Sequence, residues 1–141
     1  MKSISVLKAL AKRNLVNPTY TIIDDVLIEK KRFEENIQLR NNECLLLFFE
    51  PSVAFWVALS NLRLLIFENG FLLEINLDSI INKSFYNRKL GNMMIGSSSF
   101  IYDLIELEWL DENKVKSVKS IPIEVGSVYS FERVISFIVN N

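Results

Sequence analysis

The run of short apolar segments between Cys44 and Leu77 limits the fold more than any other feature of this chain. Four segments follow one another almost without connecting residues: CLLLFFE, VAFWVALS, LRLLIFE and FLLEINL. Their length and their alternating or wholly apolar character are typical of β-strands. Asn69 and Gly70 separate the last two segments, and both residues tolerate the positive φ of a type I′ turn. The sequence therefore predicts an antiparallel meander, with its first turn at EPS (50–52).

The second predicted strand is apolar on both sides. Alternate residues form its two faces. The first face carries Val53, Phe55, Val57 and Leu59, and the second carries Ala54, Trp56, Ala58 and Ser60. The second set is mostly small, so another element could pack closely on it. We expect either a helix or a second protomer there.

Two more strands are predicted after a gap. Residues 79–99 are rich in Asn, Ser and Gly and predict the end of a strand followed by a long loop. Residues 99–110 then alternate strictly, and residues 115–123 form a partner strand in which Lys116 and Lys119 could lie across from Glu106 or Glu108. Pro122 places this last strand at a sheet edge.

Helical periodicity is confined to the two ends of the chain. A first helix has its stripe at Ile4, Leu7, Ala11 and Leu15, can be capped by Ser3, and ends before Pro18. A second is predicted over residues 24–43, with Val26, Phe33 and Ile37 on one face; a strand over residues 20–28 is the alternative. A closing helix carries Phe131, Val134, Ile135 and Ile138, with Ser127 or Ser130 as its cap.

Length and charge restrict the class of protein. A chain of 141 residues without repeat or linker is the size of one domain. Sixteen basic and seventeen acidic residues leave a net charge of −1, so no overall field favours nucleic acid or an anionic membrane. No apolar run approaches the ~20 residues of a transmembrane helix. The first sixteen residues make a poor signal peptide because of Lys8, Lys12 and Arg13, and the single Cys44 fits a reducing compartment, so we expect a cytoplasmic protein.

The segments ALSNLRLLIFENG (58–70) and EINLDSI (74–80) resemble the strand pattern of the pleckstrin-homology-like family, particularly its bacterial and GRAM-like members. The likeness spans about residues 43–140. It implies an α+β fold: an antiparallel barrel or sandwich of about seven strands (43–141), plugged by the C-terminal helix and preceded by an N-terminal helical extension (1–42), all in one compact unit. Phosphoinositide-binding members carry basic residues around the first turn, whereas EPS has none, so no ligand residue is carried over.

Catalysis finds little support in the sequence. The chain has no histidine, the commonest general base and metal ligand, and Cys44 has no partner to activate it. The carboxylate pairs are typical of solvated faces; they are Asp24 and Asp25, Glu34 and Glu35, and Glu106 and Glu108. We therefore expect no catalytic residue, no metal and no cofactor, and keep a carboxylate-based enzyme as the weakest alternative.

The hypothesis is a non-catalytic binding module that mediates protein interaction or self-association, including a homodimer, without binding nucleic acid. Candidate ligand- or partner-binding residues are Trp56 and four residues of the basic, aromatic loop NKSFYNRK: Lys83, Tyr86, Arg88 and Lys89. The alternative function for this loop is peripheral binding to anionic lipid.

Overall fold

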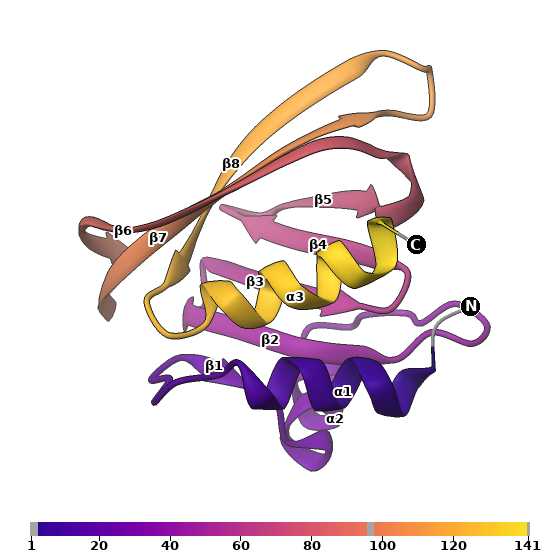
Figure 1. The fold of residues 1–141 in the computed structure, drawn as a ribbon. Helices are drawn as coiled ribbons and strands as arrows, with labels where there is room; N and C mark the ends of the chain where they lie inside the picture. Colours follow the sequence, from indigo (N-terminus) through magenta and orange to yellow (C-terminus); the bar gives the residue numbers. More distant parts are fainter. Residues whose placement is uncertain (1–2, 96–97, 141) are drawn as a thin grey trace.

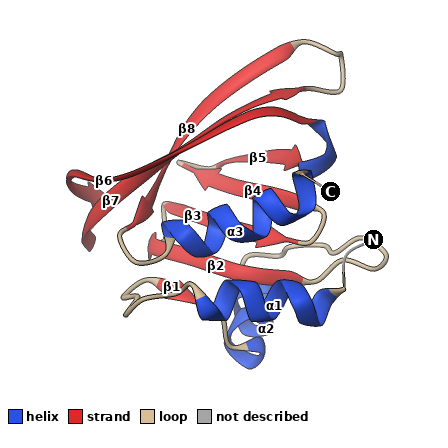
Figure 2. Cartoon of the chain, viewed as in Figure 1, coloured by secondary structure: helices blue, strands red, loops and turns tan. Residues whose placement is uncertain are grey.

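The computed structural model describes residues 3–95 and 98–140, and for residues 86–95 and 98–100 it describes the backbone alone. The described chain is an α+β structure (Figure 1, Figure 2). Its elements in chain order are α1 (Ile4–Arg13), β1 (Thr21–Ile22), α2 (Asp25–Glu34), β2 (Leu45–Ser52), β3 (Phe55–Ser60), β4 (Arg63–Glu68), β5 (Phe71–Asn76), the 3₁₀ turn η1 (Leu77–Ser79), β6 (Ile80–Ile95), β7 (Ser98–Leu110), β8 (Lys116–Glu124) and α3 (Val128–Val139).

The strands form two antiparallel sheets. The first has the order β1-β2-β3-β4-β5 and the second the order β6-β7-β8. Helices α1 and α3 lie side by side against the first sheet, and the second sheet crosses above it (Figure 1). The expectation was an antiparallel barrel or sandwich; in the described residues the two antiparallel sheets are not closed into a barrel. In residues 3–95 and 98–140, no helix has both the length and the apolar character needed to span a membrane.

The predicted meander is confirmed in β2 to β5. Asn69 and Gly70 have φ of 50° and 87°, and the hairpin they close pairs Glu68 with Phe71. The predicted first turn at residues 50–52 is wrong, because β2 continues through Ser52 and the chain turns at residues 53–54. The strand accommodates Pro51 where its register with β3 shifts, between Phe49 and Ser52.

Strand β3 is buried on both faces. Phe55, Val57 and Leu59 belong to the main core with both sheets, α1 and α3. On the opposite face, Trp56 and Ala58 pack in a second cluster whose other members include Ile28 of α2 and Ile37 just beyond it. A helix or a second protomer was expected on the small face of this strand, and the structure shows that helix α2 of the same chain packs there.

The predicted apolar face of α2 is wrong. Val26 and Phe33 are 77% and 69% exposed, and Ile28 is the only residue of the helix that is buried. The helix ends at Glu34, so Ile37 reaches the core from the following segment instead of extending a helical stripe. The alternative of a strand over residues 20–28 survives only as the two-residue β1.

The predicted loop over residues 79–99 is wrong, since β6 runs through most of it. This strand pairs with β7 along nearly its whole length, and a register shift between Tyr86 and Gly91 interrupts it. Pairing with a strongly alternating partner outweighs the weak β-propensity of its own residues. On the other side of β7, Lys116 pairs with Glu108 as predicted (3.3 Å), whereas Lys119 reaches Glu68 of β4 (3.1 Å).

The end of β8, just before α3, is tied to the N-terminal segment through one carboxylate. Glu124 accepts hydrogen bonds from the backbone N–H groups of Thr19 (3.1 Å) and Tyr20 (2.9 Å) and from the Thr21 hydroxyl (2.7 Å). The Ser130 hydroxyl donates to the Ala11 carbonyl of α1 at 2.7 Å, so it does not cap α3. Ser3 and Ser127 stand at the N-cap positions of α1 and α3 but make no side-chain capping bond.

Candidate functional site

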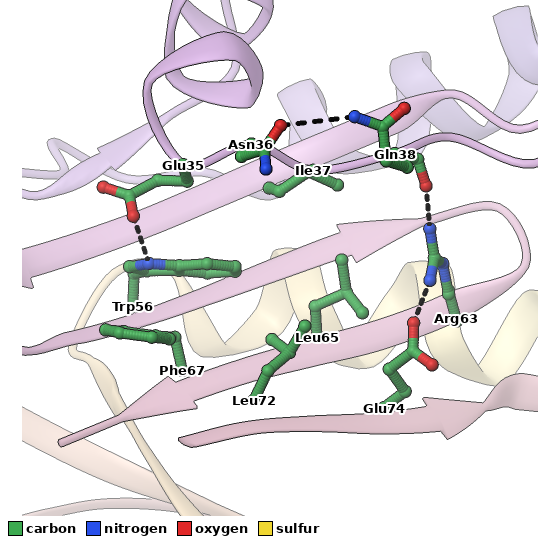
Figure 3. Close-up of a pocket in the computed structure, with 10 residues that line it drawn as sticks. All are labelled: Glu35, Asn36, Ile37, Gln38, Trp56, Arg63, Leu65, Phe67, Leu72 and Glu74. Atoms are coloured by element: carbon green, nitrogen blue, oxygen red, sulfur yellow. Dashed lines mark hydrogen bonds and ion pairs between the residues drawn. The ribbon is translucent and has the colours of Figure 1, made fainter. Parts of the chain in front are cut away.

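A pocket of about 290 Å³ opens on the face of the five-stranded sheet that carries α2 (Figure 3). Strands β3, β4 and β5 and the segment after α2 supply its walls. We call it the aromatic pocket. Its lining residues are Glu35, Asn36, Ile37, Gln38, Trp56, Arg63, Leu65, Phe67, Leu72 and Glu74.

Stacked aromatic rings form one end of the aromatic pocket. The Trp56 indole lies between Phe48 and Phe67, with ring centroids 5.2 Å and 5.5 Å away and interplanar angles of 26° and 12°. Trp56 is only 2% exposed, and its Nε1–H donates to Glu35 Oε2 at 3.1 Å. Packing and this hydrogen bond together hold the indole in one orientation, so this end of the pocket is rigid.

Glu35, the C-cap residue that follows α2, is the acidic group beside the indole. Partial burial raises the pKa of its carboxyl above the ordinary 4.5, and the neighbouring Glu50 raises it further, whereas the Trp56 hydrogen bond and Lys31 oppose the shift. The carboxyl is therefore easier to protonate than an exposed glutamate. It offers the pocket a polar edge whose charge depends on pH.

The opposite end of the pocket is closed by Arg63, whose side chain is 7% exposed. Its Nε and Nη2 donate to the two oxygens of Glu43 at 2.8 and 3.0 Å, and Nη2 also donates to the Gln38 carbonyl at 2.6 Å. Nη1 pairs with Glu74 of β5. Arg63 thus has two carboxylate partners, so it is a poor candidate for binding an external anion.

Glu43 is the fully buried partner of this cluster. Burial by itself would raise the pKa of the Glu43 carboxyl, but hydrogen bonds from Arg63, from the Arg40 backbone N–H (2.8 Å) and from the Ser60 hydroxyl (2.6 Å) lower it. Glu43 therefore stays ionised at neutral pH. The cluster fixes the segment after α2 against β4, which keeps the pocket walls apart.

The rim of the pocket on β5 is apolar and exposed. Leu72 is 53% exposed; Phe71, the next residue toward the turn, is 81% exposed, with its side chain on the opposite face of the strand. Leu72 lies opposite Phe67 in the β4–β5 register, so the exposed rim is continuous with the aromatic end of the pocket. Figure 3 shows the side chains of Phe67 and Leu72 on the same face of the sheet.

A second, larger hollow lies along the other side of β5. It has a volume of about 640 Å³ and is bounded by residues 72–79 on one side and by the β7–β8 hairpin, including Trp109 and Leu110, on the other. We call it the inter-sheet groove. Six of its lining residues are charged: Glu74, Asp78, Asp111, Glu112, Arg40 and Lys114.

The sequence-predicted binding residues are distributed over different places. Trp56 lines the aromatic pocket, whereas Lys83 lies on β6, half-buried, where its ammonium donates to Asn140 Oδ1 at 2.8 Å. The side chains of Tyr86, Arg88 and Lys89 lie outside the described residues. The backbone places these three residues at or beside the register shift of β6. Trp56 and Lys83 line separate hollows, so they do not form one site.

The sequence-predicted carboxylate pairs have structural partners. Asp24 caps α2 by accepting from Val26 N–H (3.0 Å) and Leu27 N–H (3.1 Å), and Asp25 pairs with Lys8 (3.1 Å). Glu34 pairs with Lys31 at 3.4 Å. In the described part of the chain, no group of three or more Cys, Asp or Glu side chains is placed to hold a metal ion.

Sequence reasoning missed the Glu43–Arg63–Glu74 cluster. The sequence contained a signal for the Arg63–Glu74 pair. Arg63 shares a face with Leu65 and Phe67 in an otherwise apolar strand. The Asn69-Gly70 turn brings Glu74 opposite Leu65, so Glu74 is the diagonal neighbour of Arg63 on the same face. A cation in a buried stripe requires a carboxylate nearby. Glu43 could not be found this way, because it precedes β2 and reaches Arg63 only through the tertiary fold.

The aromatic pocket thus combines a rigid apolar surface, a fixed ion cluster and an exposed apolar rim. Comparisons of the chain with protein-family models, with curated proteins and with solved structures found no match.

Proposed function

We propose that this chain is a pleckstrin-homology-like module without catalytic activity, whose function is to bind another protein or a second copy of itself. The order of elements supports the fold part of this proposal. A meander (β2 to β5), a second meander (β6 to β8) and a closing helix over the core follow the order of that family. The five- and three-stranded sheets would correspond to the two halves of an open sandwich, with β1, α1 and α2 as additions.

The exposed apolar rim of the aromatic pocket is the observation that carries the functional part. Leu72 is exposed and is continuous with a hollow whose floor contains Trp56, Leu65 and Phe67, while Phe71 is exposed on the opposite face of the same edge strand. Scattered exposed apolar residues are ordinary, but an exposed one that borders an apolar hollow is typical of an interaction surface. Aromatic residues at the centre of such a surface commonly supply most of the binding free energy.

Multi-angle light scattering and affinity capture test this proposal. Light scattering of the full chain over a wide concentration range measures self-association. Quantitative capture from a lysate then compares the wild-type chain with Phe71→Ser/Leu72→Ser. We expect that either the dimer or the captured partner of the wild type is lost in this double variant, because it removes Leu72 from the pocket rim together with the exposed Phe71 on the other face of β5.

A matched control uses another exposed apolar pair, on α2. Val26→Ser/Phe33→Ser removes similar apolar area outside the lining of the pocket, so it should leave association unchanged. A chain that is monomeric at every concentration and captures nothing, or one whose association depends on α2 and not on the rim, contradicts this assignment of the binding surface.

A further inference from the structure

Strand β5 is an edge strand of the five-stranded sheet. It pairs with β4 on one side, and the sheet order ends with it on the other. Its outer side faces the inter-sheet groove and not a hydrogen-bonded strand of the described chain. An unprotected strand edge is a template for another strand, and proteins usually protect such edges with charge, proline or a covering element. The sequence FLLEIN contains no proline and one charge.

The residues whose backbone groups face the groove can be identified from the pairing. Leu77 N–H donates to the Leu62 carbonyl at 3.0 Å, so Leu77 faces β4. Backbone groups of an antiparallel strand alternate in direction from one residue to the next. Leu72 and Glu74, at even spacing from Asn76, therefore direct their N–H and C=O groups away from β4 and toward the groove.

The side chains around this edge provide alternating positions for an added strand. On one face lie the aromatic pocket and Leu72; on the other lie Leu73 and Trp109 of the inter-sheet groove. Successive side chains of an extended segment point to opposite faces. A strand laid on β5 would thus place every second side chain beside the aromatic pocket and the others in the groove.

The charges of the groove select the chemistry of the added segment. Its lining carries four carboxylates, Glu74, Asp78, Asp111 and Glu112, against Arg40 and Lys114. Asp78 and Glu112 form no ion pair with any other residue that the structure describes. A second copy of β5 would bring the same excess of negative charge to the contact, so charge complementarity favours a different, basic partner.

From these observations, and resting on the binding function proposed above, we propose that β5 accepts an extended segment of a partner protein by strand addition, and that this segment alternates apolar and basic side chains. Backbone hydrogen bonds to Leu72 and Glu74 provide the attachment, the aromatic pocket takes apolar side chains, and the acidic side of the groove takes lysine or arginine.

The experiment titrates the full chain, labelled with ¹⁵N, with an amidated peptide of alternating lysine and valine, and then with the glutamate–valine peptide of the same length. Amide hydrogen exchange is followed with and without peptide. We expect the lysine peptide to bind at least about tenfold more tightly than its acidic counterpart and to slow exchange at Leu72 and Glu74. Binding should weaken as salt rises from about 0.02 to 0.3 M, because the groove charges are then screened.

Two variants at one position separate backbone pairing from side-chain contact. Leu72→Pro removes the outward N–H while leaving the pairing with β4, which proline tolerates at an edge. Leu72→Thr keeps the N–H and shortens the side chain. We expect Leu72→Pro to abolish binding and Leu72→Thr to retain most of it. Circular dichroism verifies that each variant is folded, and the exchange measurement on the wild type does not depend on either.

Several outcomes would overturn the inference. These are equal binding of the two peptides, peptide-induced protection elsewhere than β5, and unchanged binding by a folded Leu72→Pro chain. Protection of the β5 amides by the chain's own dimerisation, without peptide, would assign the edge to a second copy instead. In that case, or if a partner depends on the rim but not on the β5 backbone, the proposed binding function stands while the strand-addition inference fails.

Discussion

Strands β3 and β5 have similarly apolar sequences and opposite environments. Every residue of β3 is buried, from Phe55 to Ser60, because the main core covers one face and α2 with its following segment covers the other. Strand β5, two places away in the same sheet, has one buried residue, Ile75. Apolar composition thus gives both strands their β-structure, whereas position in the sheet decides whether a side chain stabilises the fold or remains available to a partner. Mutations in the two strands should separate stability from binding.

The largest effect is expected from Trp56→Ala in β3. The change removes a buried ring stacked on two others and leaves a cavity, so we expect the free energy of unfolding to fall by about 3–5 kcal/mol. Urea denaturation followed by circular dichroism measures it. Phe71→Ala in β5 is the matched aromatic control. If the two variants lose similar stability, the contrast between the strands is wrong.

Arg63→Met should have the next largest effect. The substitution leaves Glu43 as a buried carboxylate without its cation, and removing one partner of a buried ion pair costs roughly 3 kcal/mol. Glu74→Gln is the comparison, because Glu74 lies on the exposed strand, with its side chain 42% exposed, and its loss leaves Arg63 paired with Glu43. Denaturation of both variants should show a much smaller loss for Glu74→Gln; equal losses would contradict this.

Acid should destabilise the protein partly through Glu43. The pKa of this carboxyl is lower in the folded chain than its ordinary value of 4.5, so its stabilising contribution is present above that value and is lost as pH falls through the folded pKa. We expect Glu43→Gln to flatten the fall in unfolding free energy below about pH 4.5. Glu35 has the opposite shift, so its contribution is present at low pH and is lost as pH rises past 4.5. A steeper acid slope in Glu43→Gln would contradict the assignment.

The smallest effect on stability is expected from the rim. Phe71→Ser/Leu72→Ser should change the unfolding free energy by no more than about 0.5 kcal/mol, because both side chains are already largely exposed. Thermal and urea denaturation measure this change. A loss comparable to that of Trp56→Ala would mean that the rim is part of the core, and the loss of association expected above would then report unfolding.

The meander could be predicted from sequence because its signals are local. The strand segments and the Asn69-Gly70 turn fix which residues pair and which faces they share, as the observed register confirms. The closing helix could also be predicted from sequence, and Phe131, Val134 and Ile135 are buried as expected. Both cases rest on periodicity within ten or so residues.

The wrong predictions concern elements whose structure depends on contacts with residues distant in the sequence. Nothing local in residues 79–99 indicates a long strand; β7 supplies the pairing that makes it one. Val26 and Phe33 look like a core stripe, but α2 packs against the sheet through Ile28, which leaves both of them exposed. At the candidate site, Trp56 was identified, whereas the ion cluster and the open edge of β5 depend on which elements cover the sheet, and the spacing of residues in one chain does not specify that.

The carboxylate of Glu124 has a consequence for how the protein is made. It accepts hydrogen bonds from the backbone N–H groups of residues 19–20 and from the Thr21 hydroxyl, and the Ser130 hydroxyl donates to the carbonyl of Ala11. Ribosomes release the amino-terminal helix first, yet its docking groups arrive more than a hundred residues later. The stripe of Leu7 and Ala11 must therefore wait, uncovered by α3, until translation is nearly complete. During that interval the nascent chain should depend on chaperones more than its modest size suggests.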